Sequence, residues 1–211
     1  MPFESMTRDG GSMTGEERLR DLIGGLYETV ADIRLLPRVL KALADELGAA
    51  SGVLFVVDSE TGAFNSWSSM PIEKKLIQAL HENFGLIEFI KKVSADTPKG
   101  AILTRQAFLS DREYGKCALF RDVLSHVNVW DVMADVFMRS GNTIAMIGFI
   151  RPRRSKPFDD DKFETYRRLA PHIERSVRLY RQVARLEVQR NDAAEVLDRL
   201  PLGVMLVDAG G

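Results

Sequence analysis

Two pairs of strand-like segments, each joined by a short turn, constrain the fold of this chain most. Residues 52–58 form a near-continuous apolar run, and turn residues connect them to a second strand-like segment at 63–69. Residues 129–139 and 143–151 repeat the arrangement around a Ser-Gly-Asn turn signal. Short turns join antiparallel neighbours, and a strand that is apolar throughout lies inside a sheet covered on both faces. The chain is therefore expected to build an antiparallel sheet.

Helical segments flank these hairpins in the sequence. Apolar residues recur every three or four positions over 16–32, after the candidate N-cap Thr14 with Glu17 three residues on. Further helices are expected at 37–47, 71–85, 86–93 and 111–127, and a short strand at 101–104. Hairpins with flanking helices predict an α+β fold with an antiparallel sheet of five or six strands.

Residues 159–200 form one long helical pattern that only Pro171 interrupts. A proline inside a helix removes a hydrogen bond, so a kink or a break between two helices is expected near Ala170. Farther on, spacings of four and three define a seam typical of two-stranded coiled coils. The seam consists of Leu179, Val183, Leu186, Arg190, Ala193, Leu197 and Leu200. It predicts a homodimer through this helix; the alternative is an amphipathic helix that packs on its own domain.

Composition narrows the possible partners. The 29 Lys and Arg residues balance 30 Asp and Glu residues, so the net charge is close to zero. The overall charge therefore does not indicate a nucleic-acid or anionic-membrane partner. Residues 151–190 carry 12 Lys and Arg against 6 Asp and Glu, a pattern that we interpret as a solvated helix face. No stretch reaches the roughly 18 apolar residues of a membrane span, and the start lacks a signal-peptide core. We therefore expect no membrane partner and a cytoplasmic location.

The sequence contains no pattern typical of catalysis or metal binding. The three His residues are far apart, and there is no phosphate-binding loop and no Gly-x-Ser-x-Gly motif. We therefore expect no catalytic residues, no metal site and no enzymatic activity, and the cofactor remains unknown. The single cysteine, Cys117, is expected to be a buried thiol rather than a nucleophile or chromophore anchor. His172 is either a switch group or a helix-packing residue.

Aromatic residues on the segments that flank the predicted sheet are candidates for a small-molecule pocket. Such sites are concave and mostly apolar, with a few polar groups. The candidates are Trp67, Phe84, Tyr114, Phe120 and Trp130. The alternative is that these side chains are ordinary core residues that bind no ligand.

Several stretches resemble the GAF-like N-terminal sensory regions of bacterial LuxR-type helix-turn-helix transcriptional regulators. They are LIGGLYETV at 22–30, LPRVL at 36–40, LGA at 47–49, FDD at 158–160 and LAPHI at 169–173. Residues 200–211 are similar to the start of a PAS-like segment. The resemblance implies a GAF/PAS-like sheet, a disordered N-terminus at 1–15, a sensory domain at 16–170 and a signalling helix at 171–200. Residues 201–211 would be the truncated start of a following PAS-like domain; alternatively, they add a last strand to the main sheet.

The resemblance implies a dimeric, non-enzymatic sensor of a transcriptional regulator. DNA would then be bound only through a C-terminal module that is absent from these 211 residues. An alternative is the input domain of a signalling enzyme such as a histidine kinase or diguanylate cyclase. A dimerisation module without a ligand is a further possibility.

Overall fold

The structure is a computed structural model that describes residues 14–70, 95–98, 100–105, 112, 116 and 129–198. The helices expected at 71–85 and 86–93, most of the helix expected at 111–127, and the expected C-terminal segment at 201–211 lie outside these residues. Of the N-terminal segment expected at 1–15, residues 1–13 lie outside them as well, whereas Thr14 and Gly15 belong to the cap and the start of the first helix. The described residues form three α-helices, one short 3-10 helix and a five-stranded sheet.

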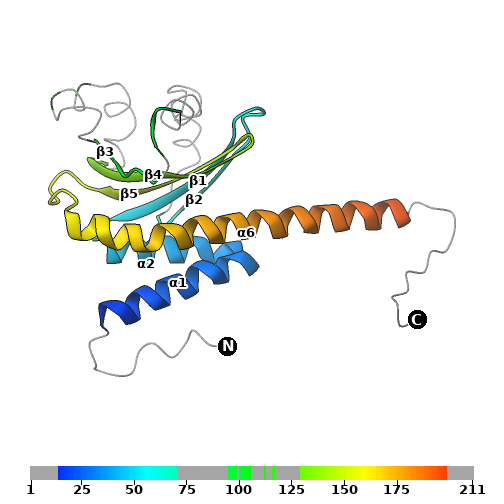
Figure 1. The fold of residues 1–211 in the computed structure, drawn as a ribbon, viewed down its shortest axis with the longest axis horizontal. Coiled ribbons are helices and arrows are strands. Elements are labelled where there is room, and N and C mark those ends of the chain that lie inside the picture. The colour runs from blue at the N-terminus through cyan, green and yellow to red at the C-terminus, as the bar shows by residue number, and fades with distance from the viewer. Residues whose placement is uncertain are drawn as a thin grey trace.

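Three helices lie on one side of a sheet (Figure 1). They are α1 (Gly15–Ala31), α2 (Leu36–Glu46) and α6 (Asp160–Asp198), and the short 3-10 helix η1 (Ile33–Leu35) connects the first two. Helix α1 begins with the expected capping box, in which the Thr14 side chain accepts from the Glu17 backbone and Glu17 reaches back to Thr14. The capping-box pattern thus correctly located the first helix.

The sheet is antiparallel, with strand order β2-β1-β5-β4-β3. Its strands are β1 (Ser51–Asp58), β2 (Phe64–Ser68), β3 (Leu103–Thr104), β4 (Asp131–Ser140) and β5 (Thr143–Arg151). The hairpins β1–β2 and β4–β5 are those expected from the sequence, and β1 pairs with β5 to place the two hairpins side by side. The α+β fold class is confirmed, with five strands in the described part of the chain.

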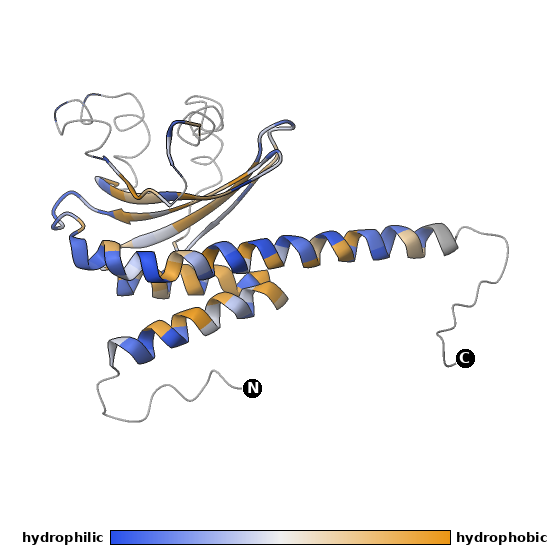
Figure 2. Cartoon of the chain, viewed as in Figure 1, coloured by the Kyte–Doolittle hydropathy of each residue, from blue (hydrophilic) through white to orange (hydrophobic). Residues whose placement is uncertain are grey.

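Alternation along the strands sends one set of apolar side chains toward the helices. Leu54 of β1 and Ile147 of β5 are directly opposite each other on this face and are 1% and 0% exposed. They share one core with the apolar faces of the three helices. Its helical members include Leu26, Leu40, Leu43, Tyr166, Leu169, Ile173 and Val177. Figure 2 shows the hydrophobic faces of α1 and α2 within this layer.

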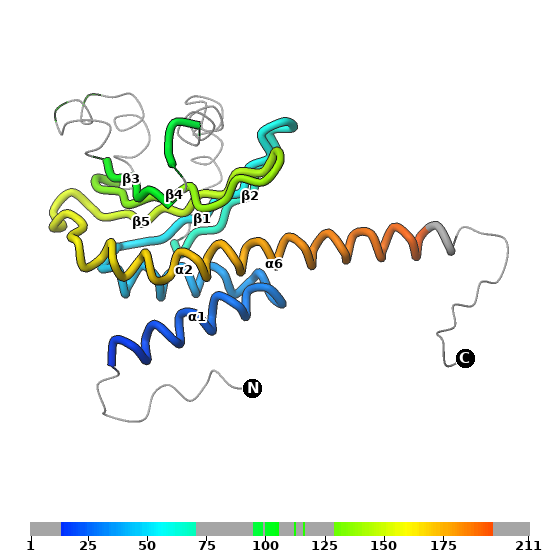
Figure 3. Tube along the Cα trace, in the orientation of Figure 1, coloured from blue at the N-terminus to red at the C-terminus, as the bar shows by residue number. Residues whose placement is uncertain are grey.

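Helix α6 runs without a break from Asp160 to Asp198, with Pro171 inside it. Of the two outcomes expected near Ala170, a kink or a break, the break into two helices is therefore wrong. Leu169 and Ile173 on either side of the proline are both fully buried (0% exposed), so packing on the core holds both turns in line. Pro171 itself is exposed, where solvent can satisfy the carbonyl that loses its partner. The tube in Figure 3 follows this helix well past the end of the sheet.

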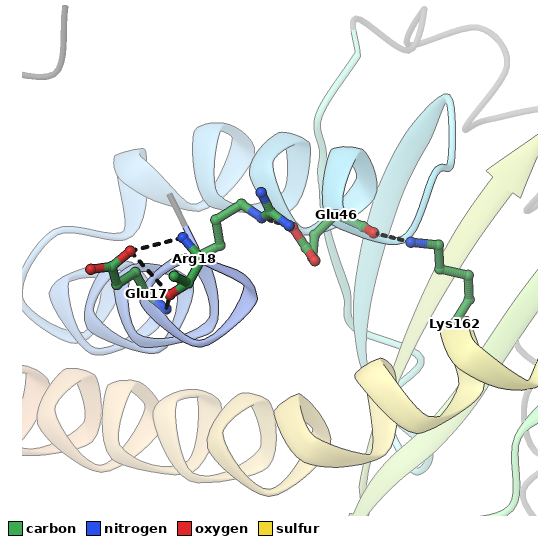
Figure 4. Close-up of polar contacts among 5 residues, drawn as sticks. Glu17, Arg18, Glu46 and Lys162 are labelled. Atoms are coloured by element: carbon green, nitrogen blue, oxygen red, sulfur yellow. Dashed lines mark hydrogen bonds and ion pairs between the residues drawn. The ribbon is translucent and has the colours of Figure 1, made fainter. Parts of the chain in front are cut away.

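The C-terminal end of α2 is held by two cations from other elements. Arg151, the last residue of β5, donates from Nη2 to the Leu47 carbonyl and from Nε to the Gly48 carbonyl, both at 2.8 Å. Lys162 of α6 donates to the Glu46 carbonyl at 2.9 Å (Figure 4). Cations at a helix C-terminus satisfy its last carbonyls and favour the helix dipole. Gly48 adopts φ +64°, and an added Cβ would lie 2.9 Å from Arg151 Nη2.

Arg151 also fixes the loop that leads into α6. Its Nη1 donates to the carbonyls of Lys156 and Pro157 at 2.7 and 2.8 Å. Its guanidinium lies 3.9 Å from the ring centroid of Phe158. One buried side chain thereby joins α2, β5 and the start of α6.

Replacement of Arg151 by Met should therefore lower the free energy of unfolding by about 3 kcal/mol, because several buried carbonyls lose their donor. Urea denaturation followed by circular dichroism measures this change. Arg34→Met is the matched control: Arg34 pairs with Asp32 at the surface, so its loss should change stability by less than about 1 kcal/mol. Equal effects of the two substitutions would contradict the assigned role of Arg151.

Candidate functional site

The face of the sheet that points away from the helices, here called the distal face, is also apolar. Val57, Val136 and Met146 are buried together on it (0, 1 and 9% exposed). The half-buried side chains that pack against them are Phe55, Phe64, Leu103 and Ile144. These positions alternate with residues that face the helices, so the apolar runs of β1, β4 and β5 serve both faces.

The distal face combines aromatic and aliphatic side chains with polar groups at one edge. The rings of Phe55 and Phe64 stack with centroids 5.4 Å apart. Ser66 lies opposite Phe55, and Ser68 lies opposite Val53, on the edge strand β2. An apolar surface with a few polar groups has the chemistry of small-molecule sites. This face is the candidate ligand-binding surface.

The structure describes two of the five pocket candidates, and they lie at opposite sides of the sheet. Trp67 is on β2, where it is paired with Leu54 on the helix-covered face, and its ring meets Tyr180 of α6 edge-on at 6.3 Å. Trp130 precedes β4, and the guanidiniums of Arg105 and Arg153 lie 5.2 and 4.5 Å from its ring centroid. Cation–π contacts of this kind favour a fixed ring position.

The remaining pocket candidates, Phe84, Tyr114 and Phe120, lie outside the described residues, as does Cys117. Sequence reasoning did not single out Phe55, Val57 or Met146 as site residues. The signal was present, because a strand that is apolar at consecutive positions must present apolar groups on both faces.

A buried polar pair connects the sheet to α6. The Tyr166 hydroxyl donates to Asp135 Oδ2 at 2.8 Å, and the two residues are 2% and 1% exposed. Burial raises the pKa of Tyr166 well above its ordinary value of 10.0, and the neighbouring Asp135 carboxylate raises it further. The tyrosine therefore keeps its proton and remains a hydrogen-bond donor. Sequence analysis did not anticipate this pair.

His172 contacts α1 from the long helix. Tyr27 Oη and His172 Nδ1 are 3.2 Å apart, and the two rings meet edge-on with centroids 6.0 Å apart. His172 therefore occupies a contact between α6 and α1.

Helix α6 leaves the domain with an exposed apolar stripe. Tyr180 of α6 contacts Trp67 of the sheet, and Arg181 Nη2 donates to Thr143 Oγ1 at 2.5 Å. Leu179, Val183 and Leu186 of the predicted seam are 38, 38 and 57% exposed. Arg190 and Ala193 are exposed as well, whereas the side chain of Leu197 and all of Leu200 lie outside the described residues.

Among the described residues, no group of three or more His, Cys, Asp or Glu side chains could hold a metal ion. None of the helices in that part of the chain has the length and apolar character needed to cross a membrane.

Alkaline pH should destabilise the native chain through Tyr166. Because the folded-state pKa is raised, the contribution of Tyr166 to stability is complete below pH 10.0, the ordinary pKa, and is lost as the pH rises above it. Unfolding free energies from urea titrations should fall by up to about 1.4 kcal/mol more per pH unit in the native chain than in Tyr166→Phe. Because Tyr166→Phe keeps every other titratable group, it is the control for the native chain. Parallel pH profiles for the two proteins would refute this assignment.

No family model and no curated protein sequence matches the chain. Solved structures share its fold. CepR2, an N-acylhomoserine lactone dependent LuxR family transcription factor from Burkholderia cenocepacia, is 16% identical with a TM-score of 0.56. The match covers 77% of this chain and 92% of that one.

Two further structures give the same result. The VqsR LBD domain from Pseudomonas aeruginosa is 14% identical with a TM-score of 0.55, and the match covers 77% of this chain and 96% of that one. SdiA, an Escherichia coli protein, in complex with octanoyl-rac-glycerol is 13% identical with a TM-score of 0.56 and coverages of 82% and 69%. At these identities the likeness establishes a shared fold alone.

Proposed function

We propose that this chain is a non-enzymatic sensory and dimerisation domain of a bacterial LuxR-type transcriptional regulator, acting in the cytoplasm. The observation that carries the proposal is the dual role of α6. Its first half packs on the sheet through fully buried residues such as Leu169 and Ile173, and its second half extends from the domain with an exposed apolar stripe. A helix of this kind can report a change at the sheet to whatever its far end contacts.

The distal face is the proposed sensing surface. It is apolar, it is opposite the helices, and it belongs to a fold that in SdiA binds octanoyl-rac-glycerol. Small molecules with an apolar body and a polar end are therefore the first ligands to test. We assign no DNA contact to the described residues, and the GAF-like character of residues 16–170 remains part of the proposal.

The exposed stripe of α6 is proposed to pack against α6 of a second copy. Leu179, Val183 and Leu186 follow one another at four and three residues, which is the spacing of a coiled-coil seam. Arg190 continues the seam with a charge, which lowers stability but can fix the register of two helices. Pairing would remove the three exposed apolar side chains from water.

A ligand should be detectable by its effect on thermal unfolding. We expect octanoyl-rac-glycerol or a related amphiphile to raise the melting temperature, because a ligand that binds only the folded state stabilises it. Phe55→Ala should weaken the shift, because it removes a ring from the distal face. Val56→Ala is the matched control, a half-buried neighbour that packs into the helix-side core. No shift with any amphiphile, or equal loss in both variants, would count against the sensing surface.

Dimerisation can be tested on the same chain by light scattering. Leu186→Asp combined with Leu197→Asp should convert the dimer to a monomer, because two charges would be buried in the seam. Val188→Asp is the control, since Val188 is similarly exposed (58%) but lies off the seam on α6. A native chain that is monomeric, or a dimer that survives the double substitution, would remove the proposed pairing.

A further inference from the structure

Strand β4 contains an irregularity beside the Asp135–Tyr166 pair. Asp135 pairs with Ile147 and Met138 pairs with Ala145, so Val136 and Phe137 of β4 stand opposite the single residue Met146 of β5. This arrangement is a β-bulge, in which one extra residue interrupts the ladder and increases the local twist. A bulge changes its geometry more easily than a regular ladder, because fewer cross-strand hydrogen bonds fix it.

Residues at the bulge point to both faces of the sheet. Val136 belongs to the distal cluster, with 1% exposure, while the adjacent Asp135, also 1% exposed, faces the helices and accepts from Tyr166 at 2.8 Å. Phe137 belongs to the helix-side core. Two consecutive residues, Asp135 and Val136, thus connect the candidate ligand surface to a side chain of α6.

Tyr166 is held firmly enough to follow a movement of Asp135. Its ring meets Phe149 of β5 edge-on with centroids 5.9 Å apart, and Leu169 one turn farther along α6 is fully buried (0% exposed). A hydrogen bond to a charged acceptor is strong and directional when it is buried. Because α6 is continuous, a displacement at Tyr166 moves the helix as far as Tyr180, 14 residues or about 21 Å along its axis.

We propose that the bulge at Asp135–Val136, through the Asp135–Tyr166 hydrogen bond, couples occupancy of the distal face to the position of α6. The inference rests on the proposed sensory function and deepens it by naming the route. A group that presses on Val136 changes the twist at the bulge, Asp135 moves with it, and Tyr166 carries the displacement into α6. Asp135 and Tyr166 are therefore positioning residues for the signal.

The contact between Trp67 and Tyr180 provides a reporter at the far end of this route. The chain has two tryptophans, so Trp130→Phe leaves the emission of Trp67 alone. In that background we would compare Val136→Ala with Val132→Ala, a matched substitution on the same strand outside the bulge. Each substitution would be made both in a chain that keeps Tyr166 and in Tyr166→Phe. If Val136→Ala does not fold, Val136→Ile, which enlarges the side chain instead of shortening it, takes its place.

We expect Val136→Ala to shift the Trp67 emission maximum and Val132→Ala to leave it unchanged. The shift should disappear with Tyr166→Phe, because the hydroxyl that joins β4 to α6 is lost. Urea denaturation gives the equilibrium constant for unfolding of Val136→Ala, of Tyr166→Phe and of the variant with both substitutions. The fold-change in the double variant should differ by about twofold or more from the product of the two single fold-changes. An unmoved spectrum, an equal shift in both backgrounds, an equal shift with Val132→Ala or additive unfolding constants would overturn the coupling. No ligand is used, so the thermal-shift screen tests the sensory function separately.

Discussion

The central strands of the sheet carry apolar side chains on both faces, and each face has to be removed from water. Leu54 and Ile147 meet the helices, while Val57 and Met146 belong to the distal cluster. At roughly 25 cal/mol per Å² of buried apolar surface, neither face can remain exposed without a large loss of stability. The helices α1, α2 and α6 satisfy this requirement on one side. The distal cluster is itself buried, with Val57 0% and Met146 9% exposed, and in the proposed function a small apolar molecule would pack beside it.

Polar contacts determine how the helices are placed on the sheet. Arg151 and Lys162 bind the carbonyls at the end of α2, so the start of α6 is fixed relative to α2 and β5. Tyr166 and Asp135 add a buried bond between α6 and β4. Tyr180 and Arg181 still contact Trp67 and Thr143, whereas Leu186 farther along the helix is 57% exposed. The same helix is therefore anchored at one end and available for a partner at the other.

Local patterns predicted most of the described fold. The capping box at Thr14, both hairpins and the long helix followed from short-range chemistry and periodicity. The continuous path of α6 through Pro171 could not be predicted, because it depends on burial of residues on both sides of the proline. The site was harder: Trp67 and Trp130 were grouped by residue type, whereas the strand order places them at opposite sides of the sheet. The Asp135–Tyr166 pair joins residues 31 positions apart, which no local pattern reveals.

The central claim is that the first half of α6 packs on its own domain and the second half packs on α6 of a second copy. Hydrogen–deuterium exchange of the purified chain at two widely separated protein concentrations tests it most directly. Amides of residues 163–181 should be protected at both concentrations, because their side chains pack on the core of the same chain. Amides of residues 184–195 should become protected only at the higher concentration, because their partner is another molecule. Exchange over residues 184–195 that is independent of concentration would contradict the account.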